Sequence, residues 1–117
     1  MLAFSNTSAI YLSIRPLDFR KQFDGMCGEV QEFLGKDPQG GHLFVFYNKR
    51  RDKLKMLWYQ PDGFWIFYKR LEAGTFQVPQ VSAEEKCCTL APEQLQLILS
   101  GIDLTSIKRR KRYKITS

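Results

Sequence analysis

Positively charged side chains gather in two stretches that could bind a polyanion. Residues 48–53 (NKRRDK) hold four cations, and residues 108–114 (KRRKRYK) hold six cations and no acid. Outside 108–114 the basic and acidic residues are equal in number, so the charge is concentrated rather than spread evenly. Lysine and arginine bind phosphates with release of counterions, in a salt-dependent and largely sequence-independent way. We therefore expect a polyanionic partner, with a merely solubilising tail as the alternative for 108–114.

The cations expected to contact DNA lie around one predicted hairpin and in the C-terminal run. They are Lys49, Arg50, Arg51, Lys53, Lys55, Lys69 and Arg70, followed by Lys108, Arg109, Arg110, Lys111 and Arg112. Four aromatic residues of the same region could offer a stacking face to bases, namely Tyr47, Tyr59, Trp65 and Tyr68. The alternative for most of these aromatics is the core of a sheet.

The sequence offers no set of residues that would make an enzyme. The one histidine, His42, begins an apolar run and is interpreted as structural, because no serine or cysteine motif accompanies it. The scattered aspartates fit capping and turn roles, so neither a catalytic nor a metal site is predicted and no cofactor is expected. Three cysteines, two of them adjacent at Cys87 and Cys88, indicate reduced thiols rather than a disulfide framework.

Three apolar runs predict the sheet that carries the first basic cluster. Residues 43–47, 54–60 and 64–70 alternate with period two, and the last two are divided by the turn Gln60-Pro61-Asp62-Gly63. Such runs with short connections form an antiparallel meander, which would have residues 48–53 at one tip.

Two further segments complete the predicted sheet. Residues 9–15 alternate until Pro16, which cannot donate to a ladder, and 76–78 could add another short strand. We therefore expect an antiparallel sheet, a meander of about four to five strands. Residues 79–88 show no periodicity and are predicted to be an irregular connection.

A long and a short helix are predicted to pack on this sheet. Asp18 suits the N-cap of the long helix, whose C-terminus is marked by Gly35. Gly28 is interpreted as allowing close approach to the sheet. The apolar stripe of the long helix comprises Phe19, Phe23, Met26, Val30, Phe33 and Leu34. The short helix begins at Pro92 and ends at Gly101, with no side-chain acceptor at Ala91 in the N-cap position.

The length of 117 residues fits one small α+β domain. We assign residues 1–107 to the domain and 108–117 to a basic tail that is predicted to be disordered. No apolar run approaches the ~20 residues of a membrane-spanning helix. No signal peptide is recognisable either, so a cytoplasmic protein with no membrane partner is expected.

Six segments, in this order and spacing, resemble one protein family. They are 18–25 (DFRKQFDG), 37–47 (DPQGGHLFVFY), 48–60 (NKRRDKLKMLWYQ), 62–72 (DGFWIFYKRLE), 74–79 (GTFQVP) and 90–103 (LAPEQLQLILSGID). Over about residues 10–104 the chain is similar to TnpB, the second-reading-frame accessory protein of IS66-type bacterial insertion sequences. The RNA-guided nuclease that shares the name TnpB is a different protein.

The resemblance implies a non-catalytic helper encoded beside a separate transposase, in the bacterial cytosol. The basic positions of the family pattern add Arg20 and Lys21 to the expected DNA contacts. The chain departs from the pattern at Ala91, where serine or threonine is usual. The basic tail gains no support, because the family's C-terminus varies.

Three hypotheses follow for the function. The leading one is an accessory protein of transposition that acts with the transposase and contacts DNA phosphates. The alternative is a protein-only scaffold that docks on the transposase without touching DNA. The least favoured is a metal-dependent nuclease, which would require carboxylates that converge on one metal ion.

Overall fold

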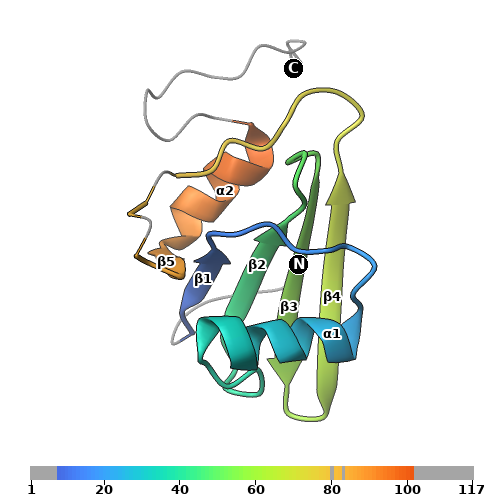
Figure 1. The fold of residues 1–117 in the computed structure, drawn as a ribbon, viewed down its shortest axis with the longest axis vertical. Helices are drawn as coiled ribbons and strands as arrows, with labels where there is room; N and C mark the ends of the chain where they lie inside the picture. Colours follow the sequence, from blue (N-terminus) through green and yellow to red (C-terminus); the bar gives the residue numbers. More distant parts are fainter. Residues whose placement is uncertain (1–7, 80, 83, 102–117) are drawn as a thin grey trace.

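The fold is a five-stranded sheet with helices on both faces (Figure 1). The computed structural model describes residues 8–79, 81–82 and 84–101; the predicted tail 108–117 and its candidate cations lie outside the described residues. The strands are β1 (Ile10–Ser13), β2 (Leu43–Tyr47), β3 (Lys53–Gln60), β4 (Gly63–Arg70) and β5 (Cys87–Leu90). The helices are α1 (Phe23–Glu29), the π-helix η1 (Val30–Leu34) that continues it, and α2 (Pro92–Ser100).

The predicted meander is confirmed. Strand β3 pairs antiparallel with β2, with Leu43 opposite Trp58, and with β4, with Trp58 opposite Trp65. Only Pro61 and Asp62 separate β3 from β4. Period-two alternation and a short proline-containing turn were sufficient to define this part of the sheet.

The prediction that the whole sheet is antiparallel is wrong. Strand β1 lies beside β2 and runs parallel to it, with Ile10 opposite Leu43, in the strand order β4-β3-β2-β1-β5. The physical reason is the connection between β1 and β2, which contains α1 and η1. A helical crossover returns the chain to the end of the sheet from which it started and so produces a parallel pair.

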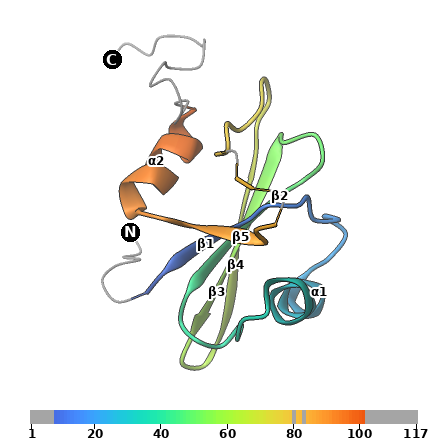
Figure 2. The same cartoon turned by 60° about the vertical axis from the view of Figure 1, so that its left-hand side comes forward.

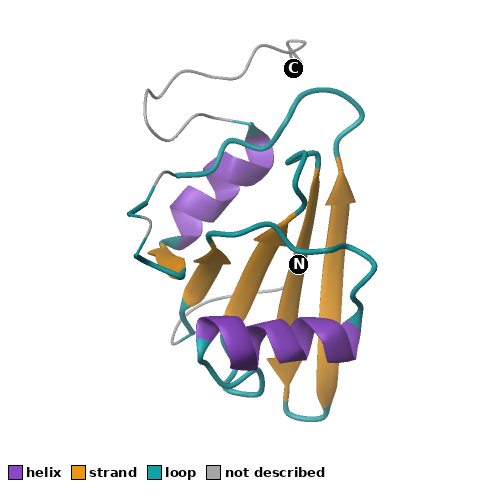
Figure 3. Ribbon diagram, in the orientation of Figure 1, coloured by secondary structure: helices purple, strands orange, loops and turns teal. Residues whose placement is uncertain are grey.

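The last strand lies in a different segment from the one predicted. Residues 76–78 form no strand but a loop (Figure 3), in which the buried Phe76 packs into the core. Instead β5 begins at Cys87, near the end of the segment 79–88 that was predicted to be irregular, and pairs antiparallel with β1, with Leu12 opposite Cys88. Cys87 and Cys88 pack against opposite faces of the sheet as unpaired, half-buried thiols.

Each face of the sheet has its own hydrophobic core, and the two helices lie on opposite sides (Figure 2). On the face of α2, Leu95 and Ile98 pack on the alternate residues Leu43, Val45 and Tyr47 of β2. On the face of α1, the buried cluster consists of Leu17, Met26, Val30, Leu34, Phe44, Phe46 and Leu57. Both sides of β2 are therefore buried, as its uninterrupted apolar sequence requires.

The long helix departs from the prediction at its start and on its surface. Asp18 is not its N-cap: the carboxylate accepts from the backbone N–H of Arg20 within a turn, and α1 begins only at Phe23. Phe23 is 45% exposed and therefore does not belong to the buried stripe. A Cβ on Gly28 would meet nothing within 4 Å, so close approach to the sheet does not explain this glycine.

Both predicted helix C-termini are confirmed. Gly35 (φ 67°) and Gly101 (φ 84°) adopt the left-handed conformation that glycine tolerates. At the start of α2, Ala91 offers no side-chain acceptor, but its own N–H donates to Oε1 of Gln94 at 2.7 Å. Half of a capping box therefore replaces the missing hydroxyl.

Candidate nucleic-acid interface

The basic loop between β2 and β3 is held in shape by the side chain of Asn48. Its Oδ1 accepts hydrogen bonds from the backbone N–H groups of Asp52 (3.0 Å) and Lys53 (2.9 Å). Its Nδ2 donates to Oδ1 of Asp52 at 2.7 Å. Arg51 adopts a positive φ of 61°, which the surrounding hydrogen bonds maintain in a residue other than glycine. The loop is thus an ordered turn.

A second segment supports the same loop from outside the hairpin. The N–H of Leu71 donates to the carbonyl of Asp52, and the N–H of Phe76 donates to the carbonyl of Arg51, both at 2.7 Å. The buried Phe76 ring anchors this segment in the core. The side chains of the loop therefore project from a backbone that is fixed on two sides.

Four cations project from this loop, and we call them the tip quartet: Lys49, Arg50, Arg51 and Lys53. Lys49, Arg50 and Arg51 are exposed, whereas Lys53 is half-buried. None forms a salt bridge with any residue of the described part of the chain. The hydrogen bond from Asn48, helped by the charges of Lys53 and Arg50, lowers the pKa of the Asp52 carboxyl. The quartet consequently keeps a surplus of positive charge.

Two other predicted DNA contacts are already paired with acids. The Arg20 guanidinium lies 2.7 Å from the Asp18 carboxylate, and this pairing holds the pKa of Asp18 well below its usual range. Arg70 lies 3.1 Å from Glu72. All four side chains are exposed, so these ion pairs are weak and can exchange for phosphate at low cost.

The remaining predicted contacts fall into different environments. Lys21 is exposed beside α1, and Lys69 donates from Nζ to the carbonyl of Leu99 at the end of α2. Lys55 is fully buried, and its Nζ donates to the carbonyls of Phe19 (3.0 Å) and Lys21 (2.7 Å). The Lys55 ammonium is therefore bound inside the domain and not exposed on its surface. The period-two pattern had placed it on a strand, but it could not show that the chain before α1 covers that face.

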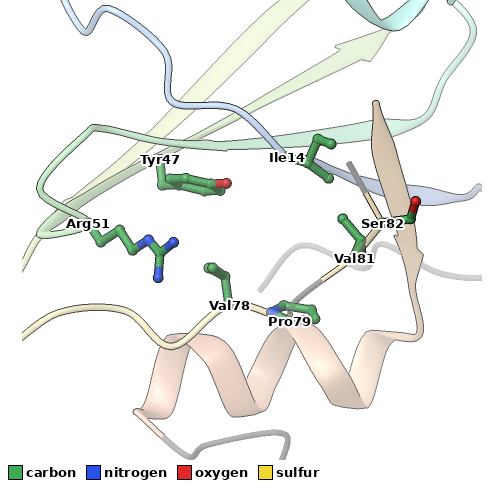
Figure 4. Close-up of a pocket in the computed structure, with 7 residues that line it drawn as sticks. All are labelled: Ile14, Tyr47, Arg51, Val78, Pro79, Val81 and Ser82. Carbon is green, nitrogen blue, oxygen red and sulfur yellow. The ribbon is translucent and has the colours of Figure 1, made fainter. Parts of the chain in front are cut away.

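A cavity of about 190 Å³ opens beside the tip quartet (Figure 4) and was not predicted from the sequence. Arg51 and Tyr47 both line it, and the Arg51 guanidinium carbon lies 5.7 Å from the centroid of the Tyr47 ring. The rest of the lining is formed by Ile14, Val78, Pro79, Val81 and Ser82. Burial raises the pKa of Tyr47, so at neutral pH the hydroxyl is an uncharged donor. These donors suit a small anionic group, but they do not form a nucleophile and base pair.

The four aromatics that could stack on bases are not equivalent. Tyr47 is buried and Tyr59 half-buried, so both belong mainly to the sheet. Trp65 is 47% exposed and Tyr68 54% exposed, on opposite faces of β4. Tyr68 packs edge-on against Phe19, whereas Trp65 lies on the face of α2.

The residues considered for catalysis have structural partners. His42 accepts a hydrogen bond at Nδ1 from the N–H of Ala9 (3.0 Å) and packs edge-on against Tyr11. The buried Glu29 is bound by Arg15 through two hydrogen bonds, a pairing that no sequence pattern indicated. Among the described residues, no three histidine, cysteine or acidic side chains are grouped to hold a metal ion.

The described helices are all too short or too polar to cross a membrane.

Comparison with known proteins supplies the family context. The family model described as IS66 Orf2 like protein matches residues 8–109. The uncharacterized protein y4jC of Sinorhizobium fredii is 33% identical over 110 residues, which cover 94% of this chain and 92% of that protein. The uncharacterized protein y4hO of the same organism is 36% identical over 103 residues, or 88% of each chain. No solved structure gives a significant match.

Proposed function

Because this chain belongs to the IS66 Orf2-like family of insertion-sequence proteins, we propose that it is a non-catalytic accessory protein of transposition. It would act beside a separate transposase and contact DNA through the phosphates. The observation that carries the DNA contact is the tip quartet, in which four cations on a fixed loop surround one acid, Asp52, and form no salt bridge among the described residues. The family supports the link to an insertion sequence, and the charge supports the DNA contact.

The fixed backbone of the loop favours binding to a regular polyanion. Cations that project from a fixed backbone require less ordering of the loop on binding than cations on a mobile loop. Each phosphate that a lysine or arginine neutralises releases counterions, which gives affinity without sequence specificity. Phosphate contacts of this kind position a protein on DNA without reading its sequence.

The other candidate cations have secondary roles in this proposal. Lys69, which is opposite Leu54 and so next to Lys53, and the exposed Lys21 would add contacts, and Arg20 and Arg70 would exchange their carboxylate partners for phosphates. Lys108, Arg109, Arg110, Lys111 and Arg112 would form a second contact as a basic arm. Lys55 is left out, because its ammonium is bound inside the domain.

The test is the salt dependence of binding to a DNA duplex. The logarithm of the affinity should fall linearly with the logarithm of salt concentration, with a slope of about −0.9 for each phosphate neutralised. Replacing Arg50 and Arg51 by alanine should flatten the slope by about two. The matched control replaces Lys36 and Lys86, which removes the same charge from cations outside the proposed DNA contacts and should leave the slope nearly unchanged. A wild-type slope near zero would contradict the phosphate contact.

A second candidate function is supported by the edge of the sheet. Strand β4 is eight residues long, pairs with β3 alone among the described strands and has several exposed side chains, so its outer edge could pair with a strand of the transposase. This protein-only scaffold should co-purify with the transposase after nuclease treatment and at high salt. If nuclease treatment dissolves the complex, the scaffold hypothesis is wrong.

A further inference from the structure

The cavity beside the tip quartet contains a hydrogen-bond donor that the described part of the protein leaves unused. The Tyr47 side chain is only 5% exposed, and its hydroxyl forms no hydrogen bond with a described residue. The hydroxyl is nevertheless not sealed off, because no fully buried side-chain oxygen or nitrogen of the described residues lacks a partner. It opens into the cavity, as Figure 4 shows. A recessed polar group that faces a cavity without a partner indicates a site for a ligand.

A positive charge lines the same cavity. The Arg51 side chain reaches into it below the Tyr47 ring (Figure 4). The positive φ of Arg51 is uncommon outside glycine, and such conformations gather at ligand sites. A guanidinium group can donate two N–H bonds to the oxygens of one phosphate or carboxylate. Arg51 and Tyr47 thus present donors to a single anionic group.

The walls of the cavity are fastened to one another through the backbone. The hydrogen bond from the N–H of Phe76 to the carbonyl of Arg51 (2.7 Å) ties the segment that leads to Pro79 onto the basic loop. The carbonyl of Tyr47 accepts from the N–H of Leu17 at 2.9 Å. An anion would therefore meet donors whose backbone is already in place, which lowers the entropy lost on binding.

The size and the charge of the site favour a terminal phosphate. The volume of about 190 Å³ is below the ~300–1,000 Å³ of sites that enclose a drug-sized ligand, so the cavity suits a small group and not a whole nucleotide. A phosphate within a duplex is flanked by sugars on both sides and meets the exposed Arg51 before the recessed hydroxyl of Tyr47. A terminal phosphate is attached on one side only and has three free oxygens. Its charge of about −1.5 to −2 complements the surplus of the tip quartet better than the single charge of a carboxylate does.

We propose that the cavity binds the terminal phosphate of a DNA strand. The Arg51 guanidinium and the Tyr47 hydroxyl donate to its oxygens, while the other cations of the tip quartet contact phosphates further along the DNA. This inference rests on the DNA contact proposed above and adds a preference for DNA ends. The apolar part of the lining restricts water around these hydrogen bonds and so strengthens them; it consists of Ile14, Val78, Pro79 and Val81.

The experiment compares three short duplexes of one sequence that carry a 5′-phosphate, a 3′-phosphate or no terminal phosphate. Each is labelled internally and titrated with the full-length protein at fixed ionic strength, and fluorescence anisotropy gives the affinities. At least one phosphorylated duplex should bind more tightly than the unphosphorylated one, by more than about tenfold. Tyr47→Phe, which removes only the hydroxyl, should weaken binding of the preferred duplex about tenfold and leave the unphosphorylated duplex unaffected. The variant should stay fully folded by circular dichroism, because the hydroxyl bonds to no described residue.

Tyr59→Phe provides the matched control, because it also removes one tyrosine hydroxyl, which donates to the carbonyl of Pro61 at the far end of β3. It should leave the preference intact. Inorganic phosphate added as a competitor should suppress the preference, whereas acetate at the same ionic strength should not.

Three results would contradict this inference. Equal binding of the three duplexes, or a preference that Tyr47→Phe leaves intact, would overturn it while the phosphate contact stands. Suppression by acetate as strong as that by phosphate would assign the cavity to a carboxylate, as on a protein partner, and would also overturn it. If no duplex binds at all, the proposed DNA contact fails together with the preference for ends.

Discussion

The ammonium of Lys55 donates a 2.7 Å hydrogen bond to the backbone carbonyl of Lys21, between a strand of the sheet and the segment that leads into α1. A second hydrogen bond joins the same ammonium to the carbonyl of Phe19, and the rings of Phe19 and Tyr68 lie about it at 5.0 and 5.2 Å. Lys55 is fully buried and no described acid forms a salt bridge with it. This lysine therefore fastens the entry to α1 onto β3.

Replacing Lys55 by methionine should separate this structural role from DNA binding. Lys55→Met keeps most of the side-chain volume but leaves two carbonyls without their donor, so it should lower the free energy of unfolding by about 1–3 kcal/mol. The slope of DNA affinity against salt should stay unchanged. Lys53→Met, on the same strand but in the tip quartet, is the control and should flatten the slope by about one. A flatter slope for Lys55→Met would show that Lys55 does reach phosphates.

The stability of the protein should also change with pH in the alkaline range, because the pKa of Lys55 differs between the folded and unfolded states. Burial lowers the pKa of Lys55 from its ordinary 10.5, with a smaller opposing effect from Asp18. The folded state therefore binds fewer protons than the unfolded state between the lowered pKa and 10.5, and stability contributed by this group rises with pH in that window.

Urea unfolding at a series of alkaline pH values measures this effect as the difference between wild type and Lys55→Met. As pH approaches 10.5, the free energy of unfolding of the wild type should rise relative to that of Lys55→Met. Tyr47, whose pKa is raised by burial, acts in the opposite sense above its ordinary 10.0, but it is present in both proteins and cancels. A pH-independent difference would contradict the lowered pKa.

Asn48 should influence the affinity of the tip quartet for DNA, although its own side chain is uncharged. Asn48→Ala removes three hydrogen bonds that shape the loop, so stability should fall by about 1–3 kcal/mol. The cations remain, so the salt slope should be preserved, while affinity at a fixed salt concentration falls because the loop must be ordered on binding. Asp37→Ala, which removes a comparable bond to the N–H of Gln39 in a loop outside the quartet, should leave affinity unchanged.

The parts of the fold that follow from local patterns were predictable. The meander depends on alternation and on turns between neighbouring strands, and the two helix C-termini depend on glycines that adopt positive φ. The parallel β1–β2 pair and strand β5 depend on contacts between segments far apart in the sequence. Four residues containing two cysteines carry too little periodicity to reveal a strand.

The candidate site was predictable as a charge cluster but not as a geometry. The sequence located the tip quartet, yet it treated Lys55 as one more cation and gave no sign of the cavity beside Arg51. Alternation shows which residues share a face, but not which face another segment covers. Asp18 illustrates the same limit, since an aspartate before a helical pattern suits a cap and a preceding turn equally well.

Replacing two glycines of the long helix by alanine should change the free energy of unfolding in opposite directions. Gly28 lies within α1, has a negative φ, and its added Cβ would enter open space, so Gly28→Ala should raise the free energy of unfolding by about 0.5–1 kcal/mol. Gly35→Ala also adds a methyl group in open space, but at φ 67° the backbone would be strained, so this variant should be destabilised. Thermal and urea unfolding of both variants provides the measurement. Destabilisation by Gly28→Ala would mean that this face of α1 contacts a part of the molecule or a partner beyond the described residues.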